Sequence, residues 1–153
     1  LVSSRGLGDV YKRQILNLNQ KIYKRFYKFN DFQFIAIGTK EINMQVENLV
    51  AQLQSGTNTE MTKWFFLLQE SKYSKNLFES LGTNLKLDEF HGSPYVFIID
   101  KKGFLRGRND SDGIKFGYDM RSVAELNNYM VDDVKIILAE YRLALKKNNN
   151  FDN

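Results

Sequence analysis

The sequence contains one histidine, and this is the side chain best suited to chemistry. His91 lies in a loop, residues 83–93, that leads directly into Pro94, the only proline. An imidazole is a ligand for transition metals. The apolar run that follows predicts a rigid strand that would aim the loop, a common setting for functional residues. His91 is therefore the candidate metal ligand; the alternative, a surface or hydrogen-bonding histidine, stays open.

Acidic side chains accompany this histidine. Asp88 and Glu89 lie in the same loop, where they would either add oxygen ligands or solvate the loop, and we favour solvation. A second acidic run, Asp110-Ser111-Asp112-Gly113, resembles the start of a calcium-binding loop. Because the further spaced acidic residues and the closing glutamate are missing, we interpret this run as a turn.

Several function classes are excluded by composition. The chain of 153 residues contains no cysteine, so disulfides, thiolate metal sites and cysteine nucleophiles are absent from it. No Ser/His/Asp triad or phosphate-binding glycine loop is recognisable. The net charge of +4 is spread along the chain, and no lysine- and arginine-rich run or RNA-binding signature indicates a nucleic-acid partner. No apolar run approaches the roughly 20 residues of a membrane helix.

A β-hairpin is the clearest structural signal, and it follows His91 directly. Residues 95–99 are aromatic or β-branched and uncharged, which predicts a strand buried on both faces. Asp100-Lys101-Lys102-Gly103 is typical of a turn, with Gly103 free to take a positive φ. Residues 104–108 then form the more polar returning strand.

The remaining elements alternate between helices and strands. Apolar spacing predicts helices over 15–29, 42–54, 72–81 and about 119–147, the last interrupted near 129–133, and strands over 32–37 and 63–68. Trp64, Phe65 and Phe66 are expected in the core. This order indicates an α/β fold with a largely parallel sheet, to which the hairpin adds an antiparallel edge.

The two ends of the chain differ in character from the middle. Residues 1–14, LVSSRGLGDVYKRQ, show no clear period and resemble the translation of a sequencing-adapter remnant. We expect them to lie outside the fold, as a cloning scar would, with the natural polypeptide continuing upstream. Residues 148–153 are expected to form a polar tail. The predicted domain therefore spans residues 15–147.

The chain resembles the Sco/SenC family, whose members have a thioredoxin-like fold and handle copper during cytochrome c oxidase assembly. The resemblance covers roughly residues 15–145 and is most specific between residues 90 and 110. It is carried by His91 ahead of the strand, by the runs Val96-Phe97-Ile98-Ile99-Asp100-Lys101-Lys102-Gly103 and Leu105-Arg106-Gly107-Arg108-Asn109-Asp110, and by Val131-Asp132-Asp133-Val134-Lys135 in the closing helix.

The resemblance implies a copper-binding metallochaperone rather than an enzyme. In the family, two cysteines of a Cys-x-x-x-Cys motif and one loop histidine bind copper, so His91 would be the third ligand. Two thiolates favour Cu(I) and the imidazole also suits Cu(II). The family implies a periplasmic, membrane-anchored protein, tethered upstream of this fragment, with a cytochrome c oxidase subunit or related copper protein as its partner.

This chain departs from the family pattern at three places. The cysteine motif is missing; it would lie just ahead of Ile15, so the chain is expected to be inactive as given. His91 lies nine residues before Asp100, one more than expected, and Gly38-Thr39-Lys40-Glu41 replaces an Asp-Pro-rich loop. Two alternatives stay open: an envelope thioredoxin-like thiol–disulfide oxidoreductase, or a cysteine-less interaction domain.

The truncation also has a structural consequence. The strand that leads into the cysteine motif of a thioredoxin-like fold is central, and here it would lie between the strands at 32–37 and 95–99. Without it, unpaired backbone groups would face a gap, each costing about 1–3 kcal/mol if buried unsatisfied. We therefore expect a poorly folding chain whose sheet has this gap or closes across it.

Overall fold

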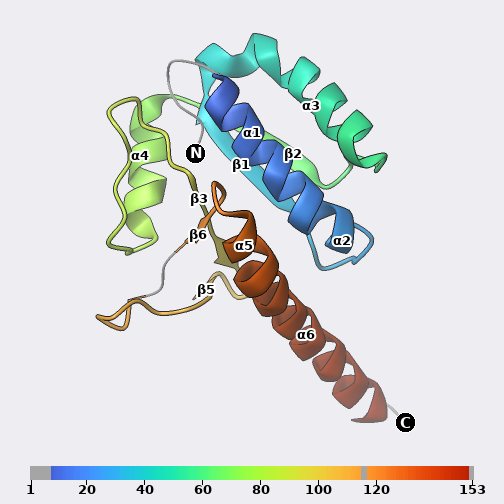
Figure 1. Cartoon of the computed structure of the whole chain (residues 1–153). Helices are drawn as coiled ribbons and strands as arrows, with labels where there is room; N and C mark the ends of the chain where they lie inside the picture. The colour runs from blue at the N-terminus through green and yellow to red at the C-terminus, as the bar shows by residue number, and fades with distance from the viewer. Residues whose placement is uncertain (1–7, 115–116, 152–153) are drawn as a thin grey trace.

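The computed structural model describes residues 8–114 and 117–151, and it has an α/β architecture of helices and small sheets (Figure 1). The N-terminal helix lies over one face of a two-stranded parallel sheet, and the long C-terminal helix extends away from the body of the molecule (Figure 1). Within the described ranges, no helix combines the length and the apolar character that crossing a membrane requires.

The N-terminal helix is continuous but changes its hydrogen-bonding pattern. α1 (Asp9–Leu18) passes through a π-helical segment, η1 (Asn19–Tyr23), into α2 (Lys24–Phe26). Its buried apolar side chains recur every three or four residues: Ile15, Leu18, Ile22 and Phe26. The structure therefore confirms the apolar face that the sequence period predicts for this helix.

The start of this helix differs from the prediction. It begins at Asp9 rather than Ile15, because the Lys12 N–H donates to the Gly8 carbonyl and the regular turn continues from there. Gln14 is buried against the core. The adapter-like tract thus contributes helical residues from position 9 onward, residues 1–7 lie outside the described part of the chain, and the origin of the tract stays a prediction.

A parallel βαβ unit follows. β1 (Phe34–Thr39) pairs with β2 (Trp64–Gln69), with Phe34 opposite Trp64 and Thr39 opposite Gln69. A 3-10 turn, η2 (Lys40–Ile42), and α3 (Asn43–Thr57) connect the two strands, and α4 (Ser71–Ser80) comes after them. The predicted types of these elements are confirmed, with bounds that shift by up to three residues.

The predicted hairpin is present with shorter strands. β4 (Ile98–Ile99) pairs antiparallel with β5 (Leu105–Arg106). β3 (Tyr95–Val96) pairs antiparallel with β6 (Tyr118–Asp119). β6 is not among the predicted strands, because the prediction starts the closing helix at about Asp119.

The closing helix starts later and runs further than predicted. α5 (Val123–Glu125) is capped by Ser122 Oγ, which accepts a hydrogen bond from the Glu125 N–H. A π-helical segment, η3 (Leu126–Met130), then leads into α6 (Val131–Phe151). This irregularity overlaps the predicted interruption, whereas the expected polar tail is helical as far as Phe151.

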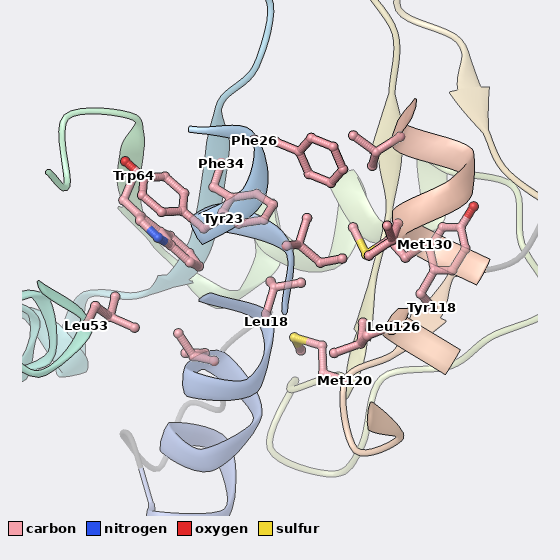
Figure 2. Close-up of a cluster of buried hydrophobic side chains, with 14 of the residues drawn as sticks. Leu18, Tyr23, Phe26, Phe34, Leu53, Trp64, Tyr118, Met120, Leu126 and Met130 are labelled. Carbon is pink, nitrogen blue, oxygen red and sulfur yellow. The ribbon is translucent and has the colours of Figure 1, made fainter. Parts of the chain in front are cut away.

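The core joins the sheet to both terminal helices. In Figure 2, one group of core side chains lies at the β1–β2 pair and consists of Tyr23, Phe34 and Trp64. A second group lies at the C-terminal helix and consists of Tyr118, Leu126 and Met130. Leu18 and Phe26 of the N-terminal helix lie between the two groups. The rings of Phe34 and Trp64 have centroids 4.6 Å apart, and the Trp64 indole N–H donates to buried Asn19 Oδ1. The indole nitrogen is thus satisfied inside the core.

Two apolar side chains expected to be buried are not. Phe65 is 48% exposed because alternation along β2 directs it away from the face that carries Trp64 and the helices. Ile99 is 55% exposed, so the strand at 95–99 is not buried on both faces. Among the described residues, β1 pairs only with β2 and β4 only with β5, so the hairpin does not join the parallel sheet as the predicted antiparallel edge, and the sheet does not close across the expected gap.

Candidate functional site

His91 lies in a tight five-residue turn, residues 88–92, between α4 and β3. The Asp88 N–H donates to the Gly92 carbonyl (2.9 Å), and the His91 N–H donates back to the Asp88 carbonyl (3.0 Å). The Asp88 carboxylate closes the turn from inside, since its Oδ1 accepts from the N–H groups of Phe90 (2.9 Å) and Gly92 (2.8 Å). The turn is therefore held by main-chain and side-chain bonds together.

The backbone of His91 is in the left-handed region, with φ = 59°. For a residue with a Cβ this conformation costs about 1–2 kcal/mol. The imidazole is partly buried, and within the described part of the chain no group hydrogen-bonds to its buried Nδ1. A strained backbone and an unpaired buried nitrogen both lower stability, and such features concentrate at functional sites.

The first turn of α1 lies directly against this loop. The Tyr11 hydroxyl donates a hydrogen bond to Asp88 Oδ2. Gly92 permits the contact, because a Cβ at this position would lie 2.9 Å from Tyr11 Cζ and 3.2 Å from Asp88 Oδ2. Burial, together with the bond to the Asp88 carboxylate, raises the pKa of Tyr11 to about 12.

Asp88 is a structural acceptor. Burial alone would raise its pKa, but the hydrogen bonds from Tyr11, Gly92 and Phe90 outweigh this effect and hold the pKa of Asp88 below its ordinary value. Asp88 is exposed, as our interpretation of it as a solvating side chain expects, and its carboxylate also organises the turn. Glu89 is exposed, as that interpretation expects.

The same turn occurs twice more in this chain. In residues 100–104, Asp100 Oδ1 accepts from Lys102 and Phe104, and Gly103 has φ = 85°. The same two main-chain hydrogen bonds also occur here: the Asp100 N–H donates to the Phe104 carbonyl, and the Gly103 N–H donates to the Asp100 carbonyl, both at 3.0 Å. This confirms the turn predicted at the tip of the hairpin.

The third copy is the acidic run that resembles a calcium loop. Asp110 Oδ1 accepts from the N–H groups of Asp112 and Ile114, both at 2.9 Å, and Gly113 has φ = 76°. The prediction of a turn here is confirmed. In all three turns the residue three places after the aspartate has a positive φ, and it is glycine in two of them. The sequence pattern Asp-x-x-Gly indicates this turn at residues 100 and 110. It does not indicate the turn at residue 88, because His91 stands at the glycine position.

The described residues alone do not fit a copper ion. His91 offers one nitrogen, Asp88 is engaged by three donors, and the soft thiolates that copper prefers are missing. Among the residues that the structure describes, no three histidine, cysteine or carboxylate side chains gather closely enough to hold a metal.

Comparisons with protein-family models, with curated proteins and with solved structures found no match for this chain.

Proposed function

We propose that this chain is the larger part of a thioredoxin-like, Sco/SenC-like domain that handles copper for cytochrome c oxidase assembly. Its α/β element order supports the proposal: a helix precedes a parallel βαβ unit, and a hairpin and a long helix close the domain. In this proposal a cysteine pair just ahead of Ile15 supplies two thiolates, and His91 supplies the third ligand. The protein then works in the periplasm from a membrane anchor, with an oxidase subunit or related copper protein as recipient.

One observation carries the proposal: the start of α1 touches the turn that holds His91. Tyr11 lies four residues before Ile15, in the tract where the cysteine pair of the resembled family would lie, and its hydroxyl bonds to Asp88 in that turn. Thiolates at such positions would therefore lie beside an imidazole whose Nδ1 has no hydrogen-bond partner among the described residues. Two thiolates and one imidazole form a donor set that accepts Cu(I) and Cu(II).

The test places a thiolate at this position. In Tyr11→Cys, added Cu(II) under anaerobic conditions should give a thiolate-to-copper absorption band, because sulfur and imidazole would then share the ion. The second substitution His91→Ala should weaken or remove that band. Arg13→Cys is the matched control, since Arg13 is exposed on the same helix and is not part of the Tyr11–Asp88 contact.

Two outcomes would contradict the proposal. If Tyr11→Cys and Arg13→Cys give the same band, or if His91→Ala leaves the band unchanged, the imidazole does not face this position. The reading frame upstream of Ile15 decides between the alternatives: Cys-x-x-x-Cys favours copper handling, Cys-x-x-Cys favours a thiol–disulfide oxidoreductase, and no cysteine pair favours an interaction domain.

A further inference from the structure

Four basic side chains form one face of the N-terminal helix. Lys21, Lys24, Arg25 and Lys28 follow one another at intervals of three and four residues, which places them on one side of a helix. The opposite side carries buried Ile22 and packs on the core. The basic face is therefore directed away from the sheet that this helix covers (Figure 1).

This basic face has no acidic partner. Residues 15–28 contain no aspartate or glutamate. Within the described part of the chain, every salt bridge uses a basic side chain from Lys72 onward, and none uses the basic face. Lys21 with Arg25, and Lys24 with Lys28, are like-charge pairs four residues apart, which destabilise a helix. A local arrangement that lowers stability is typical of a functional surface.

A hollow of about 510 Å³ adjoins the C-terminal end of the basic face. Lys28 and Lys63 line it with ammonium groups, Asn30 and Asn58 add side-chain amides, and Glu60 contributes a carboxylate. Ammonium and amide N–H groups are donors that phosphate oxygens accept. The basic face thus continues into a recess that offers donors to a phosphate group.

An exposed aromatic ring lies at the same end. Phe29 directly follows Lys28, and its side chain is 48% exposed. Its ring centroid lies 6.1 Å from that of buried Phe26, and its carbonyl accepts a hydrogen bond from the Lys63 ammonium. Aromatic and basic side chains that occur together are typical of protein surfaces at the interface of a bilayer.

The shape of this surface favours a bilayer over a nucleic acid. Proteins that bind single strands place their cations along a groove, whereas here one helix presents them on a convex face. Lipid headgroups move laterally, so their phosphates can gather at cations of any spacing. A bilayer also offers an interface into which an aromatic ring can enter.

We propose that the basic face, the hollow and Phe29 dock this chain onto a bilayer that contains anionic phospholipids. The cations bind the headgroup phosphates, and the ring of Phe29 enters the headgroup region. The attraction acts within about one Debye length of the surface. This docking requires neither copper nor His91 nor a membrane anchor, so its test is separate from that of the proposed function.

Sedimentation with vesicles tests the proposal on the full chain. Vesicles of equal parts phosphatidylcholine and phosphatidylglycerol should bind at least about tenfold more tightly than vesicles of phosphatidylcholine alone, because each cation near an anionic surface adds attraction. Sodium chloride at about 1 M shortens the Debye length to about 3 Å and should remove most of this binding.

Two double variants that remove equal charge locate the surface. Lys24→Gln with Arg25→Gln should weaken binding to the anionic vesicles about thirtyfold, since two cations of the basic face are lost. Lys146→Gln with Lys147→Gln removes two exposed cations from the end of α6 and should weaken binding less than about threefold. All four side chains are exposed, and near-ultraviolet circular dichroism checks that both variants are folded.

The variant Phe29→Trp reports on the aromatic ring. Anionic vesicles should shift the emission of the new indole to shorter wavelength, because the ring leaves water. Trp64 is the only tryptophan of the wild type and is buried in the core, so the wild-type emission should not change.

Three results would overturn the proposal. The first is equal binding to neutral and anionic vesicles. The second is an equal loss of binding in the two double variants, which would make overall charge responsible. The third is tighter binding of duplex DNA or polyglutamate than of anionic vesicles, without an emission shift in Phe29→Trp. It would assign the basic face to a nucleic acid or an acidic protein.

Discussion

The turns at residues 88–92 and 100–104 have the same backbone hydrogen-bond pattern, but they differ in the residue that adopts the left-handed conformation. In the hairpin turn this residue is Gly103, and an added Cβ would meet nothing within 4 Å. In the loop turn it is His91, which adopts the same region with a side chain attached. The hairpin turn therefore forms without backbone strain at Gly103. The loop turn is strained at His91, and this strained position carries an imidazole.

The aspartates of the two turns also have different third partners. Asp100 lies 3.4 Å from Arg106, whose guanidinium donates to Glu140 on α6 at 2.8 Å, so the hairpin is tied to the closing helix by charge. Asp88 instead receives the hydroxyl of Tyr11 from α1. One local motif can therefore either anchor a hairpin to a helix or hold a histidine beside another helix.

Acid should have the largest effect, because it acts on all three turns at once. The pKa values of Asp88, Asp100 and Asp110 lie below their ordinary values in the folded chain. A lowered folded pKa stabilises the fold above the ordinary pKa, and this stabilisation is lost as pH falls through the folded value. The urea midpoint should therefore drop as the pH falls below the ordinary aspartate pKa of about 3.9 and through the lowered pKa values of the folded chain.

The variant Asp88→Asn sharpens this expectation for the first turn. It retains an oxygen acceptor but does not titrate, so the drop of its urea midpoint with acid should be smaller than that of the wild type. An identical pH profile would show that Asp88 does not contribute to the acid sensitivity.

Removing the Asp88 carboxylate should be the next largest effect. In Asp88→Ala the buried Gly92 N–H and the Tyr11 hydroxyl lose their acceptor, and we expect the free energy of unfolding to fall by about 2 kcal/mol. Urea denaturation measures this change. Glu89→Ala is the control, because Glu89 is exposed in the same turn and should change stability by less than about 0.5 kcal/mol.

Substitutions at the two left-handed positions, His91 and Gly103, should change the free energy of unfolding least. They test directly whether the two turns differ in backbone strain. His91→Gly should raise the free energy of unfolding by about 1 kcal/mol, and Gly103→His should lower it by a similar amount. Lys102→His is the control for the second turn, since Lys102 has no positive φ. If His91→Gly destabilises the chain, the imidazole makes contacts that outweigh its backbone strain.

Local pattern was sufficient to predict most of the elements. The spacing of Ile15, Leu18, Ile22 and Phe26 identified the buried face of the first helix, and the uncharged run at 95–99 located the hairpin. β6 could not be predicted in this way, because Tyr118 and Asp119 form a strand only through pairing with Val96 and Tyr95, which lie 22 and 24 residues away along the chain. Such a short strand has no period of its own.

The candidate site was predicted only in part. His91 was identified by residue type, but the role of Asp88 was missed because its hydrogen bonds join residues two and four places ahead, with histidine where the other turns carry glycine. Tyr11 was missed because its contact spans 77 positions. The pairing of Tyr11 with Asp88 follows from the packing of α1 beside the loop.

The sequence by itself determined the α/β order, the location of the only histidine and the absence of a thiolate, because each follows from residue types and from short-range periods of two and 3.6 residues. Tertiary structure decided which edges stayed unpaired, how far Phe65 and Ile99 were exposed, and that the start of α1 meets the turn of His91. These properties depend on how separate elements pack, and packing joins residues whose distance along the chain carries no local signal.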